Sequence, residues 1–184
     1  MLTTRLLILD VDGILTDGTK VYDKDHNVLS KRFMCKDFSA IKRFMAAGIK
    51  VIMISGDSWN RDMAKKRNID FYCTRDVGTL NLDKSILLDE FSKKYNVYHH
   101  HMAFVGDDYF DLSMFQALEN TFCTADSPDI IKQHAAVVLK SKGGEGVIRE
   151  LYDLFIMKKW IREDPDMEKV LELDRLEQTS QEMK

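Results

Sequence analysis

Short segments rich in apolar residues alternate along the chain with segments that have amphipathic, helical spacing. The apolar segments lie at residues 6–9, 50–55, 69–73, 102–105, 121–124 and 135–139. Runs of this kind are typical of strands buried on both faces of a parallel sheet. Because strands alternate with helical segments, the pattern predicts an α/β fold with a mostly parallel sheet and right-handed crossovers.

The segments between these strands carry helix signals. Asp37 is predicted to cap a helix that runs to about Ala47, and Gly48 follows as its end. Residues 81–95 repeat apolar side chains at helical spacing. Further helices are expected at about 58–67 and 110–118, from Pro128 onward, and at about 147–160.

Two parts of the chain depart from this alternation. Residues 19–34 contain two short segments around the turn-rich stretch 23–27, which predicts a β-hairpin projecting from the first loop. A lone hairpin is marginal in water, so we expect it to pack on another surface, such as a second subunit. Residues 161–184 are highly charged, which predicts a polar surface helix or a frayed tail after one domain over residues 1–160.

Composition places the chain among ordinary globular proteins. It has 184 residues, 45% hydrophobic and 31% charged, and its 27 basic and 30 acidic residues give a formal charge of −3. No global basic field favours nucleic acid, and no apolar run approaches the ~20 residues that span a bilayer. Three widely spaced cysteines and the lack of a signal-peptide pattern favour reduced thiols and a cytoplasmic location.

The chemistry starts at the end of the first apolar segment. Leu6–Leu9 runs directly into Asp10, with Asp12 and Gly13 after it. Open α/β sheets bind ligands at the carboxyl ends of their strands, and two crowded carboxylates need a cation or a shared proton. The same residues also suit a simple turn, so this stretch alone leaves both interpretations open.

Other strand ends supply matching groups. Ser55 and Gly56 end the second strand, Lys84 lies in the first turn of a later helix, and Gly106 is followed by Asp107, Asp108 and, one turn later, Asp111. Phosphoryl transfer needs these parts: a carboxylate nucleophile, oxygen ligands for Mg²⁺, a hydroxyl and an ammonium for phosphoryl oxygens, and a second carboxylate that moves a proton.

The ordered set resembles the four motifs of haloacid dehalogenase (HAD) superfamily phosphatases, from about Leu6 to Phe155. Residues 12–18, the hairpin and the stretch 143–149 are similar to the 3-deoxy-D-manno-octulosonate (KDO) 8-phosphate phosphatases. This resemblance implies a three-layer Rossmann-like fold without a large cap domain. It also implies a homotetramer in which the hairpins associate and neighbouring subunits help close the active site.

The resemblance implies a role for each motif residue. Asp10 would be the nucleophile that becomes an aspartyl-phosphate, and Asp12 the general acid and then the base. Ser55, Gly56 and Lys84 would hold the phosphoryl group. Mg²⁺ would bind the Asp10 and Asp107 carboxylates and the Asp12 carbonyl, with support from Asp108 and Asp111. Mg²⁺ and Lys84 would neutralise the charge that builds up on the phosphoryl group.

The sequence departs from the family where the substrate is expected to bind. Lys36-Asp37-Phe38 replaces a common Arg-Asp-Gly, and Ser55-Gly56-Asp57 replaces Thr-Gly-Arg. Losing that arginine removes a bidentate anion clamp. A substrate carboxylate would then be held less well, with Lys36, Lys42 and Lys65 as compensating cations. The resemblance still implies a small phosphorylated metabolite, a sugar or sugar acid, as substrate, and we expect a set of five residues to bind it: Lys36, Asp37, Lys42, Asp57 and Lys65.

Two alternatives remain at the level of sequence. The same fold could serve a nucleoside monophosphatase, since pocket residues from a partner subunit would decide the substrate. A non-catalytic binding or assembly module is the other, although none of the core catalytic positions is substituted. The run His99–His101 invites a metal site, but three consecutive histidines cannot all face one ion, which favours an exposed loop.

Overall fold

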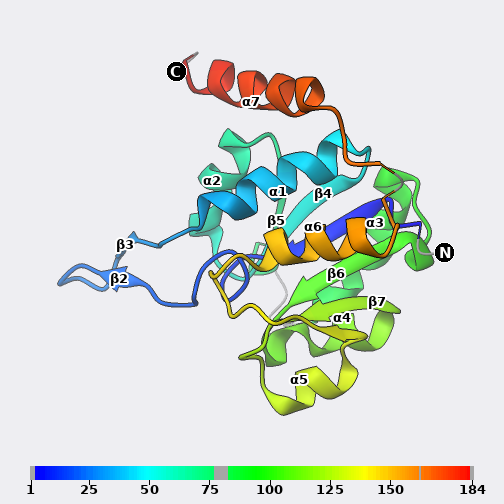
Figure 1. Ribbon diagram of the computed structural model, residues 1–184. Coiled ribbons are helices and arrows are strands. Elements are labelled where there is room, and N and C mark those ends of the chain that lie inside the picture. Colours follow the sequence, from blue (N-terminus) through cyan, green and yellow to red (C-terminus); the bar gives the residue numbers. More distant parts are fainter. Residues whose placement is uncertain (1–2, 77–82, 162, 183–184) are drawn as a thin grey trace.

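The computed structural model describes residues 3–76, 83–161 and 163–182. Its centre is a parallel six-stranded sheet in the order β5-β4-β1-β6-β7-β8 (Figure 1). The strands are β1 (Leu6–Asp10), β4 (Lys50–Ser55), β5 (Asp70–Cys73), β6 (Met102–Gly106), β7 (Asn120–Cys123) and β8 (Val137–Val138). The α/β prediction is therefore confirmed, with β1 in the interior of the sheet.

Helices cover both faces of the sheet and complete three layers. One face packs against α1 (Cys35–Ala46), α2 (Arg61–Lys66) and α6 (Val147–Met157). The other face packs against α3 (Leu88–Tyr95), α4 (Leu112–Ala117) and α5 (Asp129–His134). No large cap domain is inserted among the described residues, and none of their helices is both long and apolar enough to cross a bilayer.

The strand β1 shows why the sheet is buried on both faces. Leu7 and Leu9 point into the core shared with α1 and α6, whereas Leu6 and Ile8 point into the core shared with α3 and α4. All four side chains are fully buried. Such burial fixes the register of β1 and therefore the place where Asp10 leaves the sheet.

The predicted hairpin is present and projects from the body of the protein (Figure 1). Its strands β2 (Val21–Tyr22) and β3 (Val28–Ser30) pair antiparallel around the turn at residues 23–27. Apolar side chains on this arm stay exposed, with Val21 at 57% and Leu29 at 60% exposure. The arm therefore has little packing of its own within one subunit.

Several predicted helices begin with a turn of 3-10 helix. These turns are Ser58–Asn60 before α2, Lys84–Leu87 before α3 and Tyr109–Asp111 before α4. Another 3-10 turn, His99–His101, contains the histidine run, with no residue of it buried. Residues 81 and 82, the start of the predicted helix over 81–95, lie outside the described residues.

Two helix ends differ from the sequence prediction. The prediction that Asp37 caps α1 is wrong, because the helix already begins at Cys35 and the capping residue is Met34. The last helix of the core, α6, ends at Met157 instead of about residue 160, and Lys159 follows with a φ of 55°. After it, α7 (Met167–Glu182) lies alongside α1, where Lys42 pairs with Asp174 and Glu177.

Candidate active site

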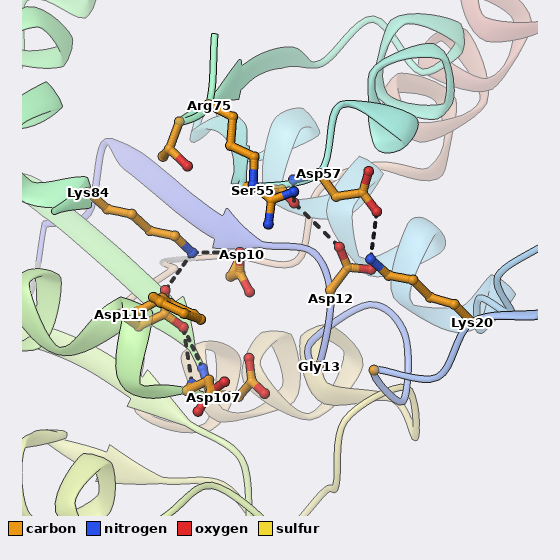
Figure 2. A pocket seen from close by; sticks show the side chains of 15 residues that line it. Asp10, Asp12, Gly13, Lys20, Ser55, Asp57, Arg75, Lys84, Asp107 and Asp111 are labelled. Carbon is orange, nitrogen blue, oxygen red and sulfur yellow. Dashed lines mark hydrogen bonds and ion pairs between the residues drawn. The ribbon is translucent and has the colours of Figure 1, made fainter. Parts of the chain in front are cut away.

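A pocket of about 330 Å³ opens at the carboxyl ends of the central strands (Figure 2). We call it the strand-end pocket. Residues from the ends of β1, β4 and β6 and from the loops after β1 and β5 line it. The lining includes Asp10, Asp12, Ser55, Gly56, Asp57, Lys84, Asp107, Asp108 and Asp111, which are nine of the residues singled out in the sequence.

Lys84 links two carboxylates at the floor of the strand-end pocket. Its Nζ donates to Asp10 Oδ1 at 2.8 Å and to Asp111 Oδ1 at 2.6 Å. All three side chains are almost completely buried. A buried ammonium between two acids is satisfied by charge-assisted hydrogen bonds, and it balances part of the negative charge beside Asp10.

Burial changes the protonation of these groups. Desolvation raises the pKa of Asp10 to about 7, against the opposing effect of Lys84. Desolvation and then the charges of Asp10 and Asp111 raise the pKa of Asp107 to about 8. Burial opposes the charge on Lys84, but the Asp10 and Asp111 carboxylates outweigh it and raise the lysine pKa. The ammonium of Lys84 therefore cannot balance all of the negative charge that these acids would carry together.

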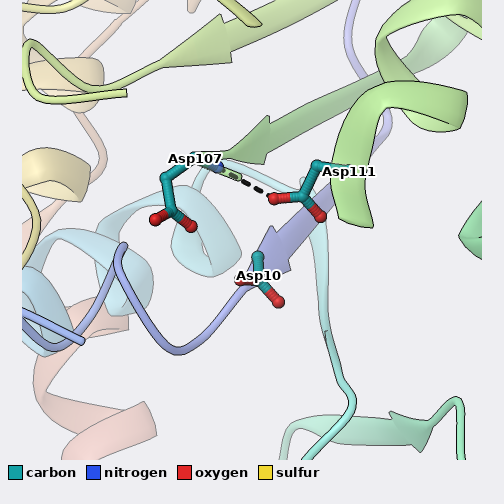
Figure 3. A group of neighbouring side chains, drawn as sticks. All are labelled: Asp10, Asp107 and Asp111. Atoms are coloured by element: carbon teal, nitrogen blue, oxygen red, sulfur yellow. Dashed lines mark hydrogen bonds between the residues drawn. The ribbon is translucent and has the colours of Figure 1, made fainter. Parts of the chain in front are cut away.

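Three carboxylates gather in a way that fits a divalent cation. Oxygen atoms of Asp10, Asp107 and Asp111 lie within 4.8 Å of one another (Figure 3). Asp107 Oδ1 is buried without a hydrogen-bond partner, which leaves it free to act as a ligand. Hard oxygen donors of this kind suit Mg²⁺, and a cation would relieve the repulsion that raises the pKa of Asp107.

Asp111 and Asp108 have additional structural roles. Asp111 Oδ2 accepts hydrogen bonds from the backbone N–H groups of Asp107 and Asp108, at 2.9 and 3.2 Å. Asp108 Oδ1 accepts from the backbone N–H of Tyr109, and Asp108 and Asp111 together form a capping box at this helix start. Asp108 is exposed and does not belong to the three-carboxylate group, whereas Asp111 does.

The loop after β1 approaches Asp107 closely. Gly13 has a φ of 90°, and a Cβ built there would lie 2.0 Å from Asp107 Oδ2. Gly143 in turn packs on this loop, since its Cβ would lie 2.3 Å from the Gly13 carbonyl oxygen. Larger residues would displace the Asp10–Asp12 loop, so the glycines set its approach to the carboxylates.

Asp12 is held by a separate set of donors on the β4 side of the pocket. Lys31 Nζ donates to its Oδ1 at 2.6 Å, and Asn60 Nδ2 donates to its Oδ2 at 3.0 Å. Ser55 Oγ lies 3.4 Å from the same Oδ2. The Lys31 side chain is fully buried, although it comes from the segment just after the hairpin. These contacts fix the Asp12 carboxylate near Ser55.

Asp57 is paired inside the protein. Its Oδ2 accepts from Lys20 Nζ at 2.7 Å (Figure 2) and from Lys31 Nζ at 2.9 Å, so the hairpin segment is tied to the end of β4. Burial alone would raise the pKa of Asp57, but hydrogen bonds from Lys20 and Lys31 hold it well below its usual range. The acid that replaces the expected arginine is therefore neutralised by two lysines.

The structure does not bring the other predicted substrate residues to the strand-end pocket. Asp37 is fully buried, and its Oδ1 accepts from the backbone N–H of Arg149 at the start of α6. Lys42 is paired with α7, as described above. Lys36 and Lys65 are exposed and do not line the pocket. Within one chain the Asp37 carboxylate is committed to α6, so its predicted substrate contact stays a prediction.

Sequence reasoning missed four polar residues that the fold brings to this region: Lys20, Lys31, Asn60 and Arg75. Two come from the hairpin segment, one from the turn before α2 and one from the turn after β5. None belongs to a motif or a periodic stripe. Only their position within five residues of a strand could have marked them.

Comparison with known proteins relates the chain to one group of hydrolases. The model of the haloacid dehalogenase-like hydrolase family matches residues 70–151. The KDO 8-phosphate phosphatase of Haemophilus influenzae is 32% identical over 157 residues, which cover 83% of this chain and 82% of that protein. The corresponding phosphatase of Escherichia coli K12 is 28% identical over 158 residues, covering 83% and 79%.

A solved structure has a similar fold. The cobalt-bound form of the Haemophilus influenzae phosphatase matches with a TM-score of 0.76 and 32% identity, and the match covers 84% of this chain and 88% of that one. The structural similarity therefore extends over most of both chains.

Proposed function

Because this chain belongs to the KDO 8-phosphate phosphatase family of the haloacid dehalogenase-like hydrolases, we propose that it hydrolyses a small phosphorylated sugar acid through an aspartyl-phosphate on Asp10. It is a Mg²⁺-dependent phosphatase. The observation that carries the proposal is the group of Asp10, Asp107 and Asp111 carboxylates within 4.8 Å, beside the ammonium of Lys84.

In the first step, an Asp10 carboxylate oxygen attacks phosphorus and the bond from phosphorus to the ester oxygen breaks. Asp12 gives its proton to that departing oxygen, which leaves as an alcohol. In the second step, Asp12 takes a proton from water, the water oxygen attacks phosphorus, and Asp10 is released together with inorganic phosphate. The contacts from Lys31 and Asn60 support this role by holding the Asp12 carboxylate in one orientation.

The remaining residues bind the groups that carry charge. Ser55 Oγ, the backbone at Gly56 and the Lys84 ammonium would hold the phosphoryl oxygens. The Asp10 and Asp107 carboxylates and the Asp12 carbonyl would hold Mg²⁺, with Asp111 and Asp108 behind them. The ion supplies positive charge that offsets repulsion between the phosphate and the Asp10 carboxylate. The free Oδ1 of Asp107 supports its place in this set.

We also propose a cytoplasmic homotetramer assembled through the hairpins. The exposed apolar side chains of Val21, Tyr22 and Leu29 support this assembly, since they would be buried against neighbouring hairpins. Three cysteines without a disulfide support a reducing compartment.

A phosphatase screen tests the proposed function. The panel would contain sugar phosphates, phosphorylated sugar acids including KDO 8-phosphate, and nucleoside monophosphates, each with Mg²⁺ and after chelation. We expect turnover of sugar-acid phosphates that requires Mg²⁺ and is lost in Asp10→Asn. Turnover restricted to nucleotides would contradict the substrate class, and no turnover of any ester would contradict the enzyme itself.

A further inference from the structure

Arg75 lies in a tight turn that the sheet places beside the phosphoryl-binding strand end. In the register of β4 and β5, Cys73 is opposite Ser55, and the Thr74 N–H donates to the Ser55 carbonyl at 3.1 Å. The Asp76 N–H donates back to the Cys73 carbonyl at 3.1 Å and closes the turn. The turn therefore presents Arg75 directly next to the end of β4.

Neighbouring contacts hold this turn in place. Asp76 forms an ion pair with Arg61 of α2, so the acid next to Arg75 is already occupied. A Cβ built on Gly56 would lie 3.6 Å from Arg75 Nε, which places the guanidinium group against the glycine backbone. In Figure 2 the Arg75 side chain points from its turn toward Ser55 and into the strand-end pocket.

Among the described residues, Arg75 differs from the other cations of the pocket in having no acidic partner. Lys20 is paired with Asp57, and Lys84 is paired with Asp10 and Asp111. In the described parts of the chain, no carboxylate pairs with the Arg75 guanidinium, although it lines the pocket. A guanidinium carries a fork of N–H donors that matches a carboxylate with two parallel hydrogen bonds.

The depth of Arg75 indicates which part of a substrate it meets. Ser55 and Lys84, on the floor, are 2% and 5% exposed, whereas Arg75 is exposed at the opening. A phosphoryl group at Asp10 would occupy the floor, so the leaving group would pass the opening. We propose that Arg75 binds the carboxylate of a sugar-acid leaving group and gives the enzyme its preference for acidic esters; this inference rests on the proposed function.

Two esters that differ in one group provide the test. 6-Phosphogluconate and sorbitol 6-phosphate are open-chain molecules with the same phosphate, and only the first has a carboxylate. We expect wild type to prefer 6-phosphogluconate. In Arg75→Gln, kcat/KM for this ester should fall at least about tenfold more than kcat/KM for sorbitol 6-phosphate, mainly through KM. Arg75→Lys should recover only part of the preference.

Arg5→Gln is the matched control, because it removes the same charge from an exposed residue just before β1, at the opposite end of the strands. It should leave the ratio unchanged. An equal loss of kcat/KM on both esters in Arg75→Gln would assign Arg75 to the phosphoryl group and overturn the inference. The inference would also be overturned if the ratio of the two kcat/KM values did not change, or if wild type showed no preference. Failure of wild type to hydrolyse any ester in the screen would instead overturn the proposed function.

Discussion

Lys31 connects the hairpin segment to the acids of the site through a single buried side chain. Its Nζ donates to Asp12, Asp57 and Asn60 at 2.6, 2.9 and 3.0 Å. Without this cation, Asp12 would lose its ion pair with Lys31, whereas Asp57 would keep its ion pair with Lys20. Partly buried carboxylates depend on such pairing, so Lys31 matters for the position of Asp12.

We predict that Lys31→Met lowers kcat by about 10- to 100-fold, since a misplaced general acid loses most of its benefit. Steady-state kinetics on a phosphorylated sugar acid would measure the change. Lys24→Met, at an exposed position of the hairpin turn, is the matched control and should keep wild-type kcat. An unchanged kcat in Lys31→Met would show that Asp12 does not depend on this contact.

Asp107 should give the magnesium-free protein a characteristic dependence on pH. Its pKa is raised from 3.8 to about 8 in the folded state, so between these values the folded protein holds a proton that the unfolded chain has released. The contribution of this residue to the free energy of unfolding therefore falls as pH rises from about 4 to about 8. The slope of Tm against pH should be shallower in Asp107→Asn, measured by thermal unfolding after chelation.

Added Mg²⁺ should reverse this trend in wild type, because the ion binds the deprotonated carboxylates and stabilises the folded state more at higher pH. Asp107→Asn should show much less stabilisation. Equal pH slopes for wild type and Asp107→Asn without metal would contradict the assignment of this buried acid.

At the scale of single residues, sequence reasoning succeeded where strand register decides position. Asp10, Ser55 and Asp107 follow apolar strands, and parallel strands end at one edge, so their proximity could be predicted. Lys31 and Arg75 come from irregular segments whose paths depend on tertiary contacts. Asp37 was placed in the substrate site because of its neighbours in sequence, although its side chain turns toward α6.

Among the elements, a side chain of α1 caps the N-terminus of α6. The N-cap residue of α6 is Gly146, which has no side chain that could cap the helix. Asp37 of α1 takes this role through its Oδ1, 2.9 Å from the Arg149 nitrogen. A carboxylate at a helix N-terminus is favoured by the free N–H groups and by the helix dipole.

We predict that Asp37→Ala lowers the free energy of unfolding by about 1–2 kcal/mol, in line with the loss of a helix cap. Urea denaturation would measure the difference. Ser39→Ala, at an exposed position of the same helix, should change stability far less. A stability loss no greater than that of Ser39→Ala would contradict the capping role of Asp37.

The existence of most elements could be predicted from the sequence, but their boundaries could not. Apolar strands and amphipathic helices have strong periodic signals, whereas the 3-10 turns before α2, α3 and α4 have none. The charged segment after residue 161 allowed either a helix or a frayed tail. In the structure α7 lies against α1, where Lys42 pairs with Asp174 and Glu177. Such a contact between distant segments cannot be seen in the local sequence.

For the whole molecule, the projecting hairpin is the feature whose apolar side chains stay exposed within one chain. Leu29 is 60% exposed on an arm that also carries Lys20 and Lys31, the lysines bound to Asp57. Assembly through this arm would therefore act next to the strand-end pocket. The alternating pattern of strands and helices predicted the fold, but exposed side chains without a partner could not specify how many subunits meet.

We predict that Leu29→Lys shifts the proposed tetramer toward smaller species, because like charges would meet where apolar side chains are expected to pack. Sedimentation velocity at micromolar concentration would measure the mass. Asp25→Lys, at an exposed position in the hairpin turn, should leave the mass unchanged. A monomeric wild-type protein would contradict the proposed assembly.

Chemical trapping of the phosphorylated protein addresses the role of Asp10 most directly. The reaction would be quenched in acid during turnover of a phosphorylated sugar acid with Mg²⁺, treated with borohydride, and analysed by peptide mass spectrometry. We predict reduction of Asp10 to homoserine, dependent on both substrate and Mg²⁺. Steady turnover with an unmodified Asp10, or with the modification at another carboxylate, would contradict an aspartyl-phosphate at this strand end.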